Sequence, residues 1–363
     1  MSLRLGLPDD STGSPSSTQR KAYDLLSSGF GPGFNGPLLV VVEASSSSDA
    51  KAAVAQATDK VGHLADVAAV TPAMFDASGQ YALFEVIPAS GPSSKATEDL
   101  VAAIRSSSAG LRSNTGATLA VTGQTAVNID ISATMGGAMV PYLLVVVGLA
   151  LILLMIVFRS IVVPVKAALG FVLSVAATFG VVVAVFQWGW LAFLFGVQQT
   201  APIISLLPIM LIGVVFGLAM DYEVFLVTRM REEHELGEEP IEAVVTGFGH
   251  GARVVSAAAI IMISVFSGFI LSNESFIKPI GFALAMAVFL DAFVVRMTIV
   301  PAVMAIAGKR AWWLPGWLGR LLPSFDIDGA HVQPVLDIAP GHVPGHVPGR
   351  AVPVPVTADI DRP

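Results

Sequence analysis

The sequence predicts an α-helical membrane protein with five transmembrane helices, preceded by an extracytoplasmic α+β domain. Composition is the first observation behind this class: the chain of 363 residues is 54% hydrophobic and 13% charged, whereas soluble domains carry about 25% charged residues. The uneven distribution of apolar residues along the chain is the second observation. Residues 140–307 form almost unbroken apolar runs, while residues 1–130 have the composition of an ordinary soluble domain.

Five segments reach the length of about 20 apolar residues that a spanning helix needs. They lie at about 139–158, 167–187, 202–229, 253–272 and 278–307, within a bundle expected over 139–308. Lys and Arg flank the first and third connecting loops and follow the last span, and such loops are cytoplasmic. We therefore expect a multi-pass protein of the plasma membrane, with residues 1–138 outside and the C-terminus in the cytoplasm.

The outer domain alternates strand and helix signals. The expected elements are a strand at Gly36–Glu43, a helix at Ser48–His63, strands at Val67–Val70 and Tyr81–Ile87, a helix at Ser93–Ser113 and a strand at Thr118–Val121. This β-α-β-β-α-β order is that of the ferredoxin-like fold. A further helix over Thr125–Met135 is expected to lead into the first span.

The region after the last span divides into an interfacial helix and a tail. Tryptophans beside basic residues favour the headgroup layer, so 309–322 is expected to lie along the membrane surface. Residues 323–363 are rich in Pro, Gly and Val and are expected to form a disordered cytoplasmic tail. Three histidines in this tail, His331, His342 and His346, could bind a metal, but a biased composition explains them more simply.

Composition and motifs exclude several function classes. A formal net charge of −7 argues against a nucleic-acid partner, and the absence of cysteine excludes disulfides, thiol catalysis and thiolate metal sites. The sequence contains no nucleophile triad, P-loop or Rossmann fingerprint. We therefore expect neither an enzyme nor an ATP-driven machine, and no cofactor. Met1–Pro8 lacks the apolar core of a signal peptide.

An aspartate inside an apolar run is the main candidate for function. Asp221 is about 19 residues, or roughly 28 Å along a helix, from Pro202. An ionisable group near the middle of a bilayer costs several kcal/mol and indicates an ion or proton pathway. Gly213 and Gly217 share its helix face, and such small residues allow another helix to approach closely.

The last span repeats this arrangement with Ala283, Ala287 and Asp291. Two carboxylates on close-packing faces could share or relay a proton. Tyr222 is turned by about 100° from Asp221 and could donate a phenolic hydrogen bond to another neighbour. The alternative is purely structural, with each Asp binding a backbone carbonyl or a hydroxyl. The hydroxyl candidates are Ser256, Ser264, Ser267 and Thr298.

Two nearby charges receive simpler interpretations. Arg296 lies five residues after Asp291, about 140° around an α-helix, so we expect it to reach another helix or the headgroups rather than Asp291. Glu223 is interpreted as interfacial or packed against Arg229.

Several segments resemble the MmpL-type transporters of the resistance-nodulation-division superfamily. These are GLAMDYEVFLVTRMREE (217–233), FRSIVVPVKAA (158–168), GARVVSAAAIIM (251–262), LDAFVVRMTIVPA (290–302), AWWLPGWLGRLLP (311–323), LRLGLPDDST (3–12) and STQRKAYDLLSSGFGPGFNGPLLVVV (17–42). The resemblance implies proton-driven export of lipids or hydrophobic small molecules by twelve spans in two related halves. It places Asp221 and Tyr222 in the tenth-span half of a proton relay and identifies residues 1–138 as the second porter domain.

The sequence is therefore expected to be the C-terminal half of such an exporter, from a truncated or split gene or a late start. Its expected partners are the lipid bilayer, a hydrophobic or lipid cargo, and a complementary N-terminal half or a homo-oligomer. Two alternatives remain open: a non-transporting membrane protein that binds lipid or a partner through its outer domain, and a gene fragment without function.

Overall fold

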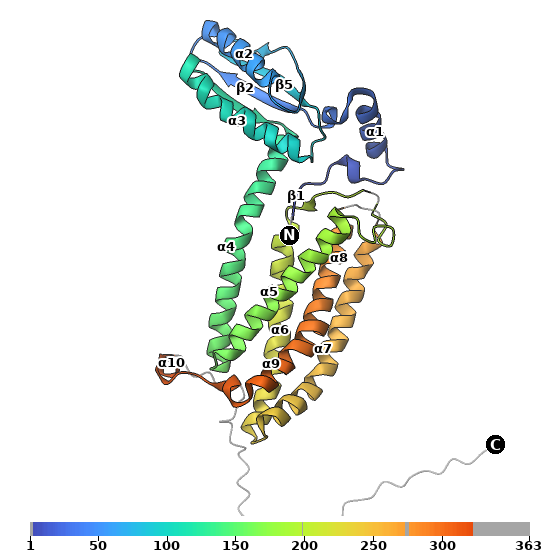
Figure 1. Cartoon of the computed structure of the whole chain (residues 1–363), viewed down its shortest axis with the longest axis vertical. Coiled ribbons are helices and arrows are strands. Elements are labelled where there is room, and N and C mark those ends of the chain that lie inside the picture. Colours follow the sequence, from blue (N-terminus) through green and yellow to red (C-terminus); the bar gives the residue numbers. More distant parts are fainter. Residues whose placement is uncertain (1–2, 198, 273–275, 322–363) are drawn as a thin grey trace, which may run out of the picture. The chain divides into compact units, whose positions relative to one another are not determined.

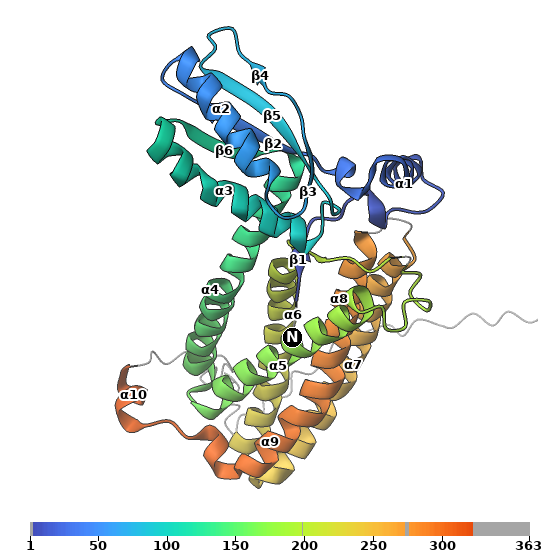
Figure 2. The ribbon, with the colours of Figure 1, turned by 45° about the horizontal axis from the view of Figure 1, so that its top comes forward.

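An antiparallel sheet and two helices form the domain that precedes the membrane helices. In the computed structural model, which describes residues 3–197, 199–272 and 276–321, the elements follow the order β2 (Leu38–Glu43), α2 (Ser47–Gly62), β3 (Val67–Val70), β4 (Met74–Phe75), β5 (Tyr81–Pro88), α3 (Lys95–Thr115) and β6 (Thr118–Thr122). The strand order is β3-β5-β2-β6, with β4 beside β5, and all these pairs are antiparallel. Figure 2 shows α2 and α3 alongside the strands.

The alternation of side chains along β2 explains the core of this domain. Leu38, Val40 and Val42 are fully buried, whereas the residues between them are only partly buried, because successive strand residues point to opposite faces. Apolar residues of α2 and α3 pack in the same cluster. Both helices begin at a capping serine, Ser46 and Ser94, whose hydroxyl accepts a backbone N–H in the first turn.

Residues 3–35 form a separate strip that reaches the membrane helices. It contains β1 (Leu5–Gly6), a short 3₁₀ turn, α1 (Thr18–Phe30) and a second 3₁₀ turn at Pro32–Asn35. Strand β1 pairs in parallel with β7 (Ile203–Ile204), which lies just before the third span. The start of the expected span 202–229 is therefore wrong: its first residues are extended and paired with β1, and the helix begins at Leu207.

Within the described residues, five helices are long and apolar enough to cross a membrane. They are α4 (Gln124–Phe158), α5 (Val162–Val182) with its π-helical extension to Gln187, α6 (Leu207–Glu235), α7 (Pro240–Ile270), and a last span built from α8 (Ile277–Phe289), a π-helical segment η4 (Leu290–Ile299) and α9 (Val300–Ala307). Helix α4 runs without a break from the sheet domain into the bundle (Figure 1).

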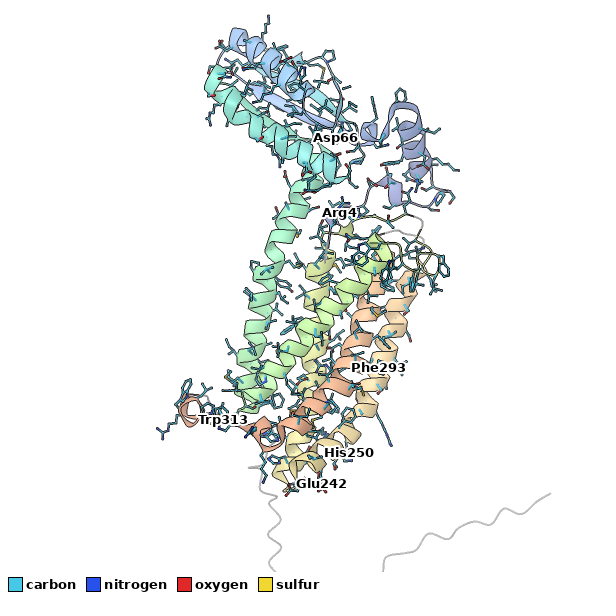
Figure 3. The ribbon with its side chains drawn as sticks, in the orientation of Figure 1. Arg4, Asp66, Glu242, His250, Phe293 and Trp313 are labelled. Carbon is cyan, nitrogen blue, oxygen red and sulfur yellow. The ribbon has the colours of Figure 1, made fainter. Side chains whose placement is uncertain are left out.

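Short helical turns close the end of the bundle that is farther from the sheet. A 3₁₀ turn covers Gly308–Trp312 and α10 covers Gly316–Leu321, so the expected interfacial segment is helical in two short pieces. Ser160 donates a hydrogen bond to the carbonyl of Ala311 over 2.6 Å. Arg4 and Trp313 lie toward opposite ends of the bundle (Figure 3). The predicted tail and its three histidines lie outside the described residues.

Glycines permit the closest contacts between elements. A Cβ added to Gly247 of α7 would lie 2.7 Å from the backbone N and Cα of Met230 in α6, and one added to Gly251 would lie 2.7 Å from Leu226. In the outer domain, a Cβ on Gly33 would lie 1.7 Å from the carbonyl oxygen of Pro88. Backbone therefore packs against backbone at Gly247 and Gly33, and against a leucine side chain at Gly251, as small residues allow.

Candidate functional site

A buried cluster of four charged side chains lies between three membrane helices. Lys166 comes from α5, Glu223 from α6, and Asp291 and Arg296 from η4; their exposures are 8%, 0%, 3% and 1%. Lys166 Nζ is 2.8 Å from Glu223 Oε1, and Arg296 Nη1 is 2.5 Å from Glu223 Oε2. Arg296 Nε is 2.9 Å from Asp291 Oδ2. We call these four residues the charge cluster.

The charge cluster is electrically balanced, because two cations face two carboxylates. Arg296 bridges both acids, and a guanidinium is suited to this role because its donors point in fixed directions. Ser174 of α5 donates to the other Asp291 oxygen over 3.3 Å, and Thr178 donates to the Ser174 carbonyl over 2.7 Å. Buried charges persist only when they are paired and hydrogen-bonded in this way.

The interpretation of Arg296 as independent of Asp291 is wrong. In an α-helix residues five apart point in different directions, but Leu290–Ile299 is π-helical, and a π-helix is closed by hydrogen bonds between residues five apart. Asp291 and Arg296 are therefore brought onto one face. The part of the expectation in which Arg296 reaches another helix is confirmed by its contact with Glu223.

The interpretation of Glu223 as interfacial is also wrong. Its side chain is fully buried and accepts hydrogen bonds from Lys166 and Arg296. Arg229 instead pairs with Glu232 over 2.8 Å and lies 5.9 Å above the Phe225 ring. Sequence spacing missed Glu223 because its partners are 57 and 73 residues away. The available signal was Lys166, a second charge within an apolar run.

Asp221 points away from the charge cluster. It is the middle residue of the 29-residue α6, and two helix positions, about 200°, separate it from Glu223. Its side chain is exposed, together with Met210, Val214 and Gly217, which share its face at helical spacing. We call these four residues the open stripe. Among the residues that the structure describes, none donates a hydrogen bond to Asp221.

Tyr222 lies between the two acidic sites. Its side chain is half-buried, and its phenol is close enough to both Asp221 and Asp291 for electrostatic interaction. The structure therefore does not bring Asp221 and Asp291 together directly. Around α6, Tyr222 lies between Asp221 and Glu223, because successive helix residues are about 100° apart.

The two expected packing seams, one on α6 and one on α8, are buried to different extents. A Cβ on Gly213 would lie 2.9 Å from the Tyr142 hydroxyl of α4, whereas one on Gly217 would have no neighbour within 4 Å among the described residues. Ala283 and Ala287 are both fully buried in α8. The α6–α7 seam at Gly247 and Gly251 was missed, although its four-residue spacing in the sequence is the usual signal.

The hydroxyls considered as structural partners of the aspartates mostly bind their own helices. Ser256 donates to the Ala252 carbonyl, Ser264 to Ile260 and Thr298 to Phe293. The hydroxyl that binds Asp291 is instead Ser174. Over residues 3–321, apart from 198 and 273–275, no group of three or more His, Cys, Asp or Glu residues could hold a metal ion.

Comparison with known proteins identifies relatives over most of the chain. It is 46% identical over 342 residues to the membrane protein YdfJ of Bacillus subtilis (strain 168), covering 93% of this chain and 47% of YdfJ. It is 33% identical over 319 residues to the mycolic acid-containing lipids exporter MmpL11 of Mycolicibacterium smegmatis (strain ATCC 700084 / mc(2)155), covering 86% and 33%.

The trehalose monomycolate exporter MmpL3 of Mycobacterium tuberculosis (strain CDC 1551 / Oshkosh) is 36% identical over 221 residues, covering 60% of this chain and 23% of MmpL3. The chain thus spans about half the length, or less, of these relatives. The MMPL family model matches residues 36–321, which include the sheet domain, the charge cluster and the open stripe. The chain therefore belongs to the MMPL family, whose named members include lipid exporters.

Proposed function

We propose that this chain forms the C-terminal half of a proton-driven exporter of lipids or hydrophobic small molecules, and that transport requires a complementary N-terminal half. The open stripe carries this proposal. A carboxylate in the middle of a spanning helix costs several kcal/mol if it faces lipid, so such residues face protein or a water-filled cavity. Asp221 has an exposed side chain at that depth, which supports a further protein surface over the stripe.

Asp221 carries the proton in this mechanism. The charge cluster is already neutral and fully paired, so it holds its helices and their charges in place. Tyr222 is half-buried and follows Asp221 directly in α6, so its phenol can hydrogen-bond across to a partner carboxylate. Asp291 supports the relay from its fixed position against Arg296. The membrane potential supplies about 2.3 kcal/mol per charge per 100 mV.

The sheet domain handles cargo outside the membrane in this proposal. We assign it to the ferredoxin-like class, and the support is its strand order with two helices between the strands. Arg159 between α4 and α5, Arg229 and Arg231 near the end of α6, and Lys309 and Arg310 after the last span support an extracytoplasmic sheet domain and a cytoplasmic C-terminus. The relatives named as exporters of mycolic acid-containing lipids and trehalose monomycolate support a lipid cargo.

Co-expression with an N-terminal half of a relative, followed by a proton-gradient-dependent efflux assay, tests the proposal. Asp221→Asn should abolish efflux while the protein level is unchanged, because the amide cannot carry the proton. Asp59→Asn is the control, since Asp59 is exposed on α2 in the outer domain. Efflux that survives Asp221→Asn would refute the relay. Binding of lipid by the chain, with no gradient-dependent efflux from any pair, would support the non-transporting alternative.

A further inference from the structure

The loop between α5 and α6 exposes a concentrated apolar surface. Residues 187–205 contain no Asp, Glu, Lys or Arg. Five large apolar side chains in this loop are exposed by between 53% and 84%: Trp188, Trp190, Leu191, Phe193 and Leu194. The rings of Trp188 and Trp190 are 5.7 Å apart. Five exposed large apolar side chains within seven positions are unusual on a surface that faces water and indicate a binding surface.

The backbone of this loop is folded in a way that holds the apolar side chains outward. The Trp190 amide donates to the Ala184 carbonyl over 2.8 Å, and the Val197 amide donates to the Ala192 carbonyl over 2.9 Å. Leu191 adopts a left-handed conformation with a φ of 56°, which is uncommon for a bulky residue. The exposed surface is thus a built feature of the loop.

A pocket with one cation lies beside the loop. Its volume is about 180 Å³, and it is lined by the loop, by the strip at Thr12–Pro15 and by the start of α8. Among the described residues that line it, Lys278 is the only charged one. Its Nζ lies 3.4 Å from the position that a Cβ on Gly196 would take. Within the described part of the chain, no carboxylate pairs with Lys278.

We propose that the loop 188–197 inserts into the bilayer leaflet on the side of the sheet domain, and that Lys278 binds the phosphate of an anionic phospholipid there. The loop is continuous with two membrane-spanning helices, and Trp side chains favour the headgroup level. An ammonium that no described carboxylate pairs with, beside an inserted apolar loop, complements a lipid that has acyl chains and a negative headgroup. This inference does not depend on transport activity.

Brominated lipids, which quench tryptophan fluorescence on contact, provide the test. The full chain is reconstituted in vesicles of phosphatidylcholine with some phosphatidylglycerol. The lipid composition is the same in two sets of vesicles. In one set the phosphatidylcholine is brominated, and in the other the phosphatidylglycerol is brominated. Three of the five Trp residues, at 312, 313 and 317, are replaced by Phe so that Trp188 and Trp190 report alone. If this variant does not fold, the quenching lost on replacing Trp188 and Trp190 in the natural chain gives the same information.

Both brominated lipids should quench the fluorescence of Trp188 and Trp190. Brominated phosphatidylglycerol should quench this fluorescence about fivefold more per molecule, which is the factor expected for one basic residue at a membrane surface. Lys278→Gln should remove this preference, whereas Lys51→Gln, in the outer domain, should leave it unchanged. Absence of quenching by either lipid would overturn the insertion. Equal quenching per molecule, or a preference that inorganic phosphate removes at constant ionic strength, would overturn the lipid headgroup site.

One further variant addresses Glu274, which lies outside the described residues. If the preference for phosphatidylglycerol appears only after Glu274→Gln, the chain itself neutralises Lys278, and the proposed headgroup site is overturned. If the preference is the same with and without this change, Lys278 is available to lipid as proposed.

Discussion

Removing the charge of Glu223 should destabilise the bundle strongly. Each of its two oxygens accepts a charged donor, Lys166 at 2.8 Å and Arg296 at 2.5 Å, and all three side chains are buried. Glu223→Gln keeps the size of the side chain but leaves the charge cluster with a net charge of +1. Breaking a buried ion pair by removing one partner costs about 3–5 kcal/mol. We expect a loss of this size in the free energy of unfolding.

The matched double variant separates charge imbalance from loss of packing. Lys166→Met alone leaves a net charge of −1 and should also cost about 3–5 kcal/mol. With Lys166→Met and Glu223→Gln together, Arg296 and Asp291 remain as a neutral pair. The double variant should therefore lose less than the sum of the single losses, by at least about 2 kcal/mol of coupling.

The free energy of unfolding can be measured by titrating sodium dodecyl sulfate into mixed micelles and following circular dichroism. Glu232→Gln is the control, since it breaks the exposed pair with Arg229, and such pairs contribute about 1 kcal/mol or less. Two results would refute the reasoning. One is a loss of unfolding free energy in Glu223→Gln that is no larger than the loss in the control. The other is a loss in the double variant that equals the sum of the two single losses.

Three other predictions concern packing and pH. Gly247→Ala should destabilise the bundle by about 1–3 kcal/mol through overpacking against α6, whereas Gly249→Ala, which has no neighbour within 4 Å, should be neutral or slightly stabilising. Gly33→Ala should lower the melting temperature of the outer domain more than Gly247→Ala lowers that of the bundle, because its Cβ would overlap a backbone carbonyl. The hydroxyl of Ser78 lowers the pKa of Asp76 to about 2, so a nuclear magnetic resonance titration should find its midpoint there, and Ser78→Ala should raise it. Because this pKa is below the unfolded value, the stabilisation by Asp76 is present above the unfolded pKa and is lost as pH falls through about 2.

Each of these predictions has a contrary result. Equal stability of the two α7 glycine variants would contradict the close approach of α7 to α6. An unchanged melting temperature of the outer domain in Gly33→Ala would contradict the contact with β5. A titration midpoint of Asp76 near the ordinary value of 3.8 would contradict its hydrogen bonds.

Periodicity predicted the helices and strands well because those signals are local. Val67–Val70 has the same bounds in sequence and structure, and each predicted apolar run overlaps one of the five candidate spans found in the described residues. The helix expected at Thr125–Met135 is continuous with the first span in α4. The start of the third span was mispredicted because Ile203 and Ile204 are as apolar as a helix needs. Only their pairing with β1, about 200 residues earlier, makes them a strand.

The candidate site was predictable only in part, for a similar reason. Asp221, Tyr222 and Asp291 stood out as polar groups in apolar runs, and their roles in a proton relay remain predictions. The partners of Asp291 could not be predicted because the helical pitch changes there. A π-helical segment aligns Asp291 with Arg296, whereas the sequence pattern was interpreted with α-helical geometry.

The sequence was enough to identify five apolar runs long enough to span a membrane, and a charged residue within the third, because hydrophobicity and chain length are properties of the residues alone. Which charges are balanced depends on how the helices pack. Lys166, Glu223, Asp291 and Arg296 neutralise one another across three helices, while Asp221 remains on an open face. Electrostatic energy depends on distances between groups far apart in the chain, and folding sets those distances.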